Sequence, residues 1–402
     1  MPLLPWLSFV TVALAAVALV GFQTRRWDTA ISGLIAAGVG ATSAVVLRDQ
    51  AFSPTSLVIT GYGGLVALAL IAGWWWVGAL AFREGIDRES GTTAYIVCVG
   101  VGLVGARLGH VLLHHSAHDS AWEVLDLRAG GLFGYGGLLA GLVALWVKLR
   151  PTAVPWQRMA DVAAPATSLG VVASWLGGYL TGGGFGRPLA GDEPNWLRSL
   201  GTFPHWPSSV LNGTGSPAFI EHAARGLVDV QAPASLPVHP TQLYSLAGSL
   251  ALMAVVVWVR RRRRFFGEAF LALAIGYGAL CFAVGFWRAD PQRCLVGPIV
   301  APAPLLAAGL LVVGVAVAVG PLRASLRVRW RGAAVWALAL GVPVTGYSLA
   351  AGQSEGPVSL SQWTGLASVI AAAILWRRWE HNQALSVHDT DRMISSANAP
   401  TE

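Results

Sequence analysis

The sequence predicts an all-α polytopic membrane protein with about 11 transmembrane helices and a small, irregular extracytoplasmic head. Its 402 residues are 54% hydrophobic and only 12% charged, whereas soluble domains carry about 25% charged residues. The 18 Trp and 48 Gly residues fit the same class, because Trp anchors helices at the membrane interface and Gly lets helices approach closely.

Eleven apolar segments are long enough to cross a bilayer as helices, which takes about 20 residues each. They are residues 5–22, 29–47, 57–82, 92–113, 132–148, 159–181, 241–259, 267–287, 297–320, 332–351 and 359–376. We interpret the first as an uncleaved helix and not as a signal peptide, because its cations, Arg25 and Arg26, follow the apolar run.

The distribution of Lys and Arg predicts an extracytoplasmic N-terminus and a cytoplasmic C-terminus. With this orientation, 19 of the 27 cations fall in cytoplasmic segments and seven in outside segments, in accord with the positive-inside rule. The densest run, Arg260 to Arg264, then lies where anionic lipid would contact it, so the net charge of +7 indicates no nucleic-acid partner. Outside residues 182–240 are rich in Gly, Pro and Ser and form the predicted head, with a short helix near Pro217 to Leu227.

Arg107, in GARLGH, lies inside a predicted span, where an ionisable side chain indicates function by default. A guanidinium binds phosphate bidentately, so a lipid phosphate is one expected partner. The alternative is that Arg107 snorkels outward or pairs with a carbonyl group. Asp161, in DVAAP, opens a span on the cytoplasmic side and is predicted to cap a helix and not to take part in chemistry.

Three histidines, His110, His114 and His118, share one helical face, with Asp119 beside them. This spacing would suit a transition metal, but the helix leaves the membrane here, and we expect solvated histidines and no metal site. We also expect no cofactor. The cysteines are too few and too scattered for a disulfide framework or a zinc site: Cys98, Cys281 and Cys294.

Two further motifs carry polar groups towards the outer half of the bilayer. In GGYLTGGGFGR, which ends at Arg187, dense glycines could offer amide N–H groups to an anion or could simply form a tight corner. In HPTQLY, His239 precedes a span that Gln242 and Tyr244 enter, and Arg288 in GFWRADP ends the next span on the same side. The residues that can meet there are Arg107, Arg187, His239, Tyr244 and Arg288.

A glycine-flanked tyrosine occurs three times in apolar segments, as GYGGL around Tyr62 and Tyr135 and as GYGAL around Tyr277. Aromatic belts and close-packing glycines would account for the repetition alone. The order of GARLGH, GGLFGYGGLLAG, DVAAP, GGYLTGGGFGR, HPTQLY and GYGALCFAVGFWR, however, resembles the successive motifs of prolipoprotein diacylglyceryl transferase.

The resemblance implies a seven-helix core over residues 57–321, with the head at 182–240. Residues 1–50 and 330–378 would then add two transmembrane helices at each end, and residues 379–402 a flexible cytoplasmic tail. Family members are bacterial inner-membrane enzymes of lipoprotein maturation. They move diacylglycerol from phosphatidylglycerol to a lipobox cysteine thiol of a lipoprotein precursor, and glycerol phosphate leaves. This chemistry needs cations for the phosphate and help in deprotonating the thiol.

By this resemblance, Tyr62, Tyr135, His239 and Tyr277 occupy catalytic positions. The expected lipid-phosphate positions are Arg107, Arg187, Arg288, Gly182, Gly186, Gln242 and Tyr244. Seven residues replace family groups: Tyr135 a histidine, Trp175 and Cys281 arginines, Gly178 an asparagine, and Gly183, Ser245 and Gly285 glutamates. The site is therefore less charged, and Tyr135, with a pKa near 10, would be a poor base.

The sequence is compatible with three functions. The chain could be a diverged transferase that acts on phosphatidylglycerol or another lipid. It could also be a non-catalytic relative that binds lipid or a lipoprotein precursor. A transporter or channel is the third alternative, but no repeat or conduction motif supports it.

Overall fold

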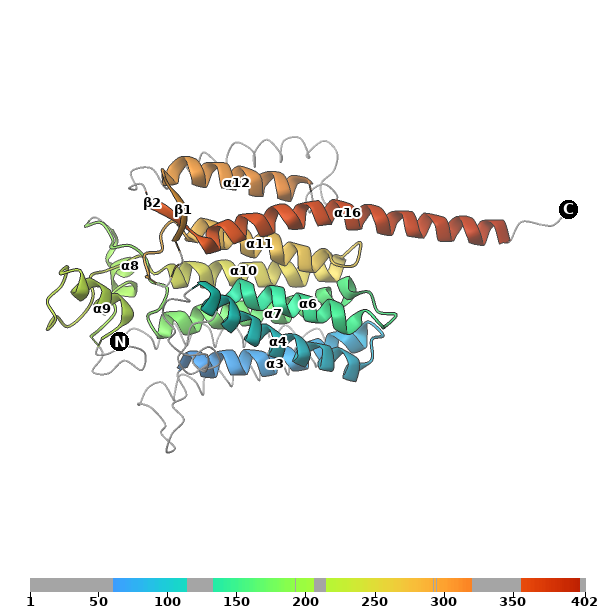
Figure 1. Cartoon of the computed structure of the whole chain (residues 1–402), viewed down its shortest axis with the longest axis horizontal. Coiled ribbons are helices and arrows are strands. Elements are labelled where there is room, and N and C mark those ends of the chain that lie inside the picture. The colour runs from blue at the N-terminus through green and yellow to red at the C-terminus, as the bar shows by residue number, and fades with distance from the viewer. Residues whose placement is uncertain are drawn as a thin grey trace, which may run out of the picture. The chain divides into compact units, whose positions relative to one another are not determined.

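The computed structural model describes residues 61–113, 133–191, 193–205, 215–291, 293, 295–319 and 356–397. Within these residues the protein is mostly helical, with ten helices and two short strands (Figure 1). The helices are α3 (Gly61–Arg83), α4 (Arg88–Leu113), α6 (Gly134–Leu149), α7 (Trp156–Leu180), α8 (Asn195–Leu200), α9 (Pro217–Ala224), α10 (Thr241–Arg262), α11 (Glu268–Val284), α12 (Pro302–Val319) and α16 (Leu360–Ala397). The predicted spans at 5–22, 29–47 and 332–351, and His114, His118 and Asp119, lie outside the described residues.

Four of the described helices are long and apolar enough to cross a membrane: α3, α4, α7 and α10. Three shorter apolar helices, α6, α11 and α12, fall at other predicted spans. This architecture is that of a helical membrane protein, as the composition predicted.

Two predicted spans differ from the structure at their ends. Residues 297–320 do not form one helix, because β1 (Leu295–Val300) comes first and α12 begins only at Pro302; proline suits a first helical turn and interrupts a helix interior. β1 pairs antiparallel with β2 (Gly356–Ser359), which leads directly into α16. The helix α16 continues beyond residue 376 to Ala397 and so includes most of the predicted tail.

The chain divides into two compact units, and each is described by itself. The first contains Met1–Val97, Ala166–Leu250 and Trp287–Gln292; the second contains Cys98–Pro165, Ala251–Phe286 and Arg293–Glu402.

In the first unit, α3 packs closely on the second half of α7. The Tyr62 hydroxyl lies 3.1 Å from Ser174 Oγ, and a Cβ atom on Gly177 would lie 2.7 Å from the Tyr62 ring. Beyond α7, the short helix α9 contributes Ala218 to an apolar cluster with Tyr179, Phe185, Phe203 and Val238, and the Tyr179 hydroxyl donates to Leu200 O at the end of α8 at 3.0 Å. The predicted helix at Pro217 is confirmed as α9, which Ser216 caps by accepting from Phe219 N.

In the second unit, α11 is the most buried helix. Its core neighbours include Val256, Ala316, Val369 and Trp376, which come from α10, α12 and α16. The second half of α4 packs on α6 through facing glycines, where a Cβ atom on Gly136 would lie 2.7 Å from the Gly105 carbonyl oxygen. Small residues allow this close backbone approach, as is common between membrane helices.

Asp161 caps a helix, as predicted, but the helix is α11 and not its own α7. Its side chain is fully buried and accepts from Gly267 N at 2.8 Å and from Phe270 N at 3.0 Å. Arg263 Nη1 lies 3.6 Å from the same carboxylate. The carboxylate thus satisfies amide groups at the start of α11 that have no partner within the helix.

Replacing Asp161 by Ala is expected to destabilise the protein by about 3 kcal/mol, because it leaves buried amides without an acceptor and Arg263 without this counterion. Asp161→Asn keeps one acceptor oxygen and is expected to lose less. Thermal unfolding of the detergent-purified protein measures both. Asp229→Ala is the control, since Asp229 is an exposed acceptor in a turn. Equal melting temperatures for Asp161→Ala and Asp229→Ala would contradict the capping role.

Candidate functional site

Three segments of the first unit run side by side as a short backbone ladder, which we call the head ladder: residues 185–188, 238–239 and 287–289. The central segment pairs on one side with His239, through Gly186 N to His239 O at 3.0 Å and His239 N to Arg187 O at 2.8 Å. On the other side, Arg187 N donates to Trp287 O at 2.9 Å and Ala289 N donates to Phe185 O at 3.0 Å. The head ladder therefore brings together Arg187, His239 and Arg288, which come from three separate sequence motifs.

Gly186 is required at the centre of the head ladder because the neighbouring strands approach too closely for a side chain. A Cβ atom there would lie 2.5 Å from His239 O and 2.9 Å from Trp287 O, well inside the contact distance of real side chains. This glycine is one that the resemblance singled out, and its role is to let the three segments meet.

The glycine-rich stretch before Arg187 forms a tight corner, which is one of the two alternatives that the sequence left open. Gly182 and Gly184 have positive φ values of 68° and 69°, a conformation that favours glycine. The amides of Gly182 and Gly183 donate to Tyr179 O and Gly178 O, and those of Gly186 and Arg187 donate within the head ladder. These backbone hydrogen bonds stabilise the corner and fix the position of Arg187.

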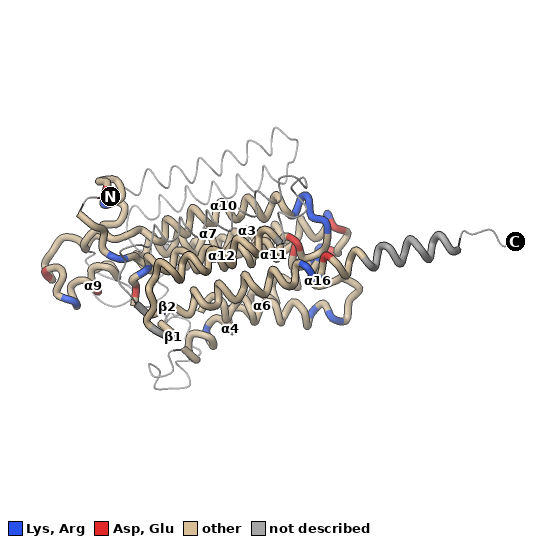
Figure 2. The backbone as a smooth tube through the Cα atoms, turned by 90° about the horizontal axis from the view of Figure 1, so that it is seen from above, with Lys and Arg blue, Asp and Glu red and all other residues tan. Residues whose placement is uncertain are grey.

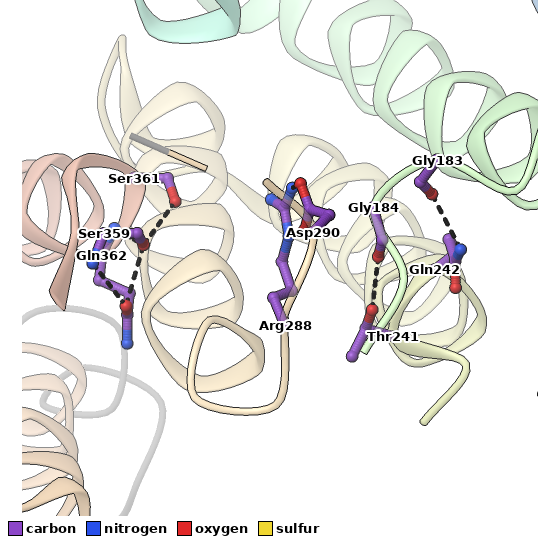
Figure 3. A network of polar contacts seen from close by, with 9 residues as sticks. All are labelled: Gly183, Gly184, Thr241, Gln242, Arg288, Asp290, Ser359, Ser361 and Gln362. Carbon is purple, nitrogen blue, oxygen red and sulfur yellow. Dashed lines mark hydrogen bonds and ion pairs between the residues drawn. The ribbon is translucent and has the colours of Figure 1, made fainter. Parts of the chain in front are cut away.

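Arg288 is held in a fixed orientation by a residue that the sequence reasoning did not weigh. Its Nε and Nη2 donate to the two carboxylate oxygens of Asp290 at 2.8 and 2.7 Å (Figure 3). Asp290 is only 2% exposed. The guanidinium also lies over the ring of Trp175, 5.8 Å from its centre, a favourable cation–π arrangement. The spacing of Arg288 and Asp290 in WRADP was the available signal for this pair.

Trp175 stands where the family resemblance places an arginine, and its contact with Arg288 gives that departure a physical meaning. A second guanidinium close to Arg288 would repel it, whereas an indole face attracts it. By the resemblance, an indole ring stands here in the place of a positive charge, and that ring attracts the guanidinium of Arg288.

His239 lies at the edge of the head ladder with Tyr244 beside it. Its Nδ1 is 3.2 Å from the Tyr244 hydroxyl. Burial lowers the pKa of His239 below its ordinary value, and the charge of Arg187 lowers it further, while Glu193 acts in the opposite direction. The imidazole is therefore neutral at neutral pH and able to accept a proton.

The first turns of α10 connect the glycine corner to a buried polar stripe. Thr241 Oγ1 donates to Gly184 O at 2.6 Å, and Gln242 Nε2 donates to Gly183 O at 2.8 Å (Figure 3). Ser245 and Ser249 follow Gln242 at helical spacing, and all three are at most 2% exposed. Gln242 Oε1 and the two serine hydroxyls have no hydrogen-bond partner among the described residues, so this stripe could bind polar ligand atoms or water.

The second unit holds another group of predicted residues. The ring centres of Tyr135 and Tyr277 are 6.2 Å apart, and the Tyr135 hydroxyl also lies near Cys281. That hydroxyl is buried and makes no well-formed hydrogen bond to any described residue. Arg107 also belongs to this unit and is almost fully buried, at 3% exposed, so its side chain does not snorkel to the surface.

The predicted residues thus fall into two local groups. The first unit contains Tyr62, Gly182, Gly186, Arg187, His239, Gln242, Tyr244 and Arg288, and the second contains Arg107, Tyr135 and Tyr277. Within the first unit, Arg187, His239 and Arg288 meet at the head ladder. Sequence reasoning missed Asp290 and Thr241, which hold Arg288 and the glycine corner in place.

Comparison with known proteins identifies one family. A family model described as prolipoprotein diacylglyceryl transferase matches residues 49–320. Two similar proteins are each called phosphatidylglycerol–prolipoprotein diacylglyceryl transferase. The one from Cupriavidus metallidurans is 28% identical over 249 residues, covering 60% of this chain and 79% of that protein. The one from Aromatoleum aromaticum is 33% identical over 193 residues, covering 47% and 61%.

Gly186→Ala is expected to open the head ladder, since the added methyl group collides with backbone oxygens on both sides. Overpacking of this kind costs about 1–3 kcal/mol, which thermal unfolding of the detergent-purified protein would detect. Gly191→Ala is the matched control, because a Cβ atom there meets nothing within 4 Å. If both variants have the melting temperature of the wild type, the close backbone approach at Gly186 is contradicted.

Proposed function

Because this chain belongs to the prolipoprotein diacylglyceryl transferase family, we propose that it transfers a diacylglyceryl group from phosphatidylglycerol to the cysteine thiol of a lipoprotein precursor. The observation that carries the site assignment is the head ladder, which sets Arg187, His239 and Arg288 on adjoining backbone segments. Two guanidinium groups and a neutral imidazole are the groups that a phosphate leaving group and a thiol nucleophile require.

In the proposed reaction, the cysteine sulfur bonds to the glycerol carbon of the diacylglyceryl group as the bond from that carbon to the phosphate oxygen breaks. The bonding electron pair leaves with glycerol phosphate, and the thiol proton passes to His239. Arg187 and Arg288 bind the phosphate and stabilise the charge that develops on it. Gly182 and Gly186 act through the backbone, by placing Arg187 beside its partners.

Other side chains have supporting roles in this proposal. Tyr244 orients His239 through its hydroxyl, and Gln242 presents Oε1 from the buried stripe of α10 to polar atoms of the lipid headgroup. Tyr62, Tyr135, Tyr277 and Arg107 remain proposed site residues from the family motifs. Tyr135 would serve as a hydrogen-bond donor, since a tyrosine is a weak base at neutral pH.

We further propose the inner membrane of a bacterium as the location, with 11 spans, the N-terminus outside and the C-terminus in the cytoplasm. The charges of α10 support this orientation, because the helix begins two residues after His239 and ends with Arg260, Arg261 and Arg262. Figure 2 shows these cations in blue at that end. α3 and α6 likewise have Arg83 and Lys148 in their last turns. The head would then face the compartment of exported precursors.

The direct test supplies phosphatidylglycerol and a lipobox peptide to the purified full chain and follows the peptide mass and released glycerol phosphate. Wild type is expected to give a diacylglyceryl mass gain. Arg187→Ala and Arg288→Lys are expected to lose about 100-fold or more in rate, as for other charge-stabilising groups. Arg225→Ala, whose side chain is 57% exposed on the same unit, is the control and should retain activity.

Two outcomes would count against this proposal in different ways. If wild type yields no product while a close relative does so in the same assay, the chain is a lipid-binding relative, which the neutral residues Tyr135, Cys281 and Gly285 would then explain. If wild type is active and Arg187→Ala is equally active, the reaction stands and the head ladder is not its site.

The pH dependence of kcat/KM should report the protonation of His239, because the proposed reaction requires its imidazole to be neutral. Because its pKa is lowered from the ordinary value of about 6.5, activity is expected to hold as the pH falls to 6.5 and to decline only below it. Glu193→Gln removes the charge that raises this pKa, so the decline should move to still lower pH. A decline centred above 6.5, or a shift to higher pH in Glu193→Gln, would contradict His239 as the base.

A further inference from the structure

The C-terminal helix α16 lies beyond the part of the chain that the family model matches, yet it packs along the whole of α11 (Figure 1). Near the middle of the contact, Gly278 and Gly365 face each other, and a Cβ atom on Gly365 would lie 2.6 Å from Gly278 O. Ser368 Oγ donates to Ala274 O across the same contact at 3.3 Å. This approach is possible only because both helices present small residues here.

At the carboxyl end of α11, α16 fills the space next to Gly285. A Cβ atom on Gly285 would collide with Gln362 Cγ and would lie 2.6 Å from Gln362 Cδ. Any larger side chain at position 285, a glutamate included, is incompatible with Gln362 in this position. The small residue Gly285 on α11 is therefore needed to accommodate the Gln362 side chain of α16.

Gln362 is itself held on both sides. Its Oε1 accepts from Ser359 N at 3.0 Å and from Ser359 Oγ at 2.9 Å, which is a capping box at the start of α16 (Figure 3). Its Nε2 donates to Phe282 O at 3.4 Å, one residue after Cys281. With 2% exposure, Gln362 links the first turn of α16 to the last turn of α11.

A second glutamine makes the corresponding link at the other end of α11. Gln383 Oε1 accepts from Phe266 N at 2.8 Å, and its Nε2 donates to Phe266 O at 3.1 Å. Arg264 Nη1 adds an ion pair with Glu380 at 3.5 Å. The two glutamines thus hold α16 to α11 in the same way, but only Gln362 lies near the residues that the sequence motifs single out.

The first turns of α16 also border the Tyr135 hydroxyl. That oxygen would lie 3.3 Å from a Cβ atom on Gly365, and it interacts with Thr364 as well as with Cys281. Tyr277 lies next to the Tyr135 ring, with the two ring centres 6.2 Å apart. The appended helix thus completes the surroundings of a family motif position.

We propose that α16 is a working part of the transferase core in this chain, and that Gln362 is a positioning residue that fixes the carboxyl end of α11 and so places Tyr277 and Cys281 against Tyr135. This inference rests on the proposed function, since it assigns Gln362 a role in that reaction. Gln362 acts through α11 and is not itself a catalytic group.

The test compares Gln362→Ala with Gln383→Ala in the full chain. Each variant loses one glutamine link between the same two helices, so both are expected to melt at a lower temperature. Gln362→Ala should lower kcat by about tenfold, in line with the loss of one or two hydrogen bonds, with KM for phosphatidylglycerol changed less than about twofold. Gln383→Ala should keep the kcat of the wild type. Equal kcat losses in the two variants would overturn the positioning role.

The space shared by Gly285 and Gln362 is tested by a double-mutant cycle in melting temperature. Gly285→Ala alone should be strongly destabilising, and adding Gln362→Ala should recover part of that loss by removing the colliding atoms. Strictly additive effects would overturn the contact.

If wild type shows no transferase activity, the proposed function fails by itself. The melting-temperature cycle does not depend on turnover, so in that case it still decides whether Gln362 holds the carboxyl end of α11: coupling between the two substitutions supports the inference, and additivity overturns it.

Discussion

The head ladder depends on one close backbone contact, at Gly186, where strands on both sides approach within distances that exclude a side chain. From this contact follow the pairing of Arg187 with His239 and Trp287 and the placement of Arg288 beside them. The three groups come from positions separated by about 50 residues each in the sequence. Their side chains can cooperate only because the backbone segments that carry them are hydrogen-bonded to one another.

Several positions where the resemblance places charged groups hold neutral residues here, and the structure shows what three of these residues contact. The Arg288 guanidinium is paired with the buried Asp290 carboxylate and lies over the indole ring of Trp175, so these two neighbours fix its orientation. Trp175 and Gly183 then have consistent roles, since the first attracts Arg288 and the second accepts from Gln242. In the second unit, Gly285 makes room for Gln362 of α16. At Trp175, Gly183 and Gly285, where the resemblance places charged groups, the structure thus shows a specific contact with Arg288, Gln242 or Gln362.

The sequence predicted the helices of the core well, because apolar runs of about 20 residues have few alternatives in a membrane. It located Arg187, His239 and Arg288 through local motifs, and it identified Asp161 as a cap. It could not show that Asp161 caps α11, since that partner lies more than 100 residues away. Residues 297–300, which belong to β1, were predicted within a helix because hydropathy does not distinguish a short apolar strand from the start of a span.

The roles of Asp290 and Gln362 were also beyond the sequence, for a physical reason. Both act through geometry: Asp290 by a bidentate pair with a residue two positions away, and Gln362 by reaching a carbonyl group 80 residues distant. A single carboxylate or amide side chain has many possible partners, and only the fold selects one. The family motifs end before α16, so they carry no information about its contacts.

The central claim is that segments 185–188, 238–239 and 287–289 are joined by hydrogen bonds in the head ladder. Hydrogen exchange of the amides tests this claim most directly. The amides of Gly186, Arg187, His239 and Ala289 all donate within the head ladder. They are therefore expected to be protected from exchange and to exchange together when the head ladder opens. Mass spectrometry of the corresponding peptides from the intact protein in detergent would report this. Rapid exchange at Ala289 with slow exchange at Gly186 and His239 would contradict the claim that the three segments are joined.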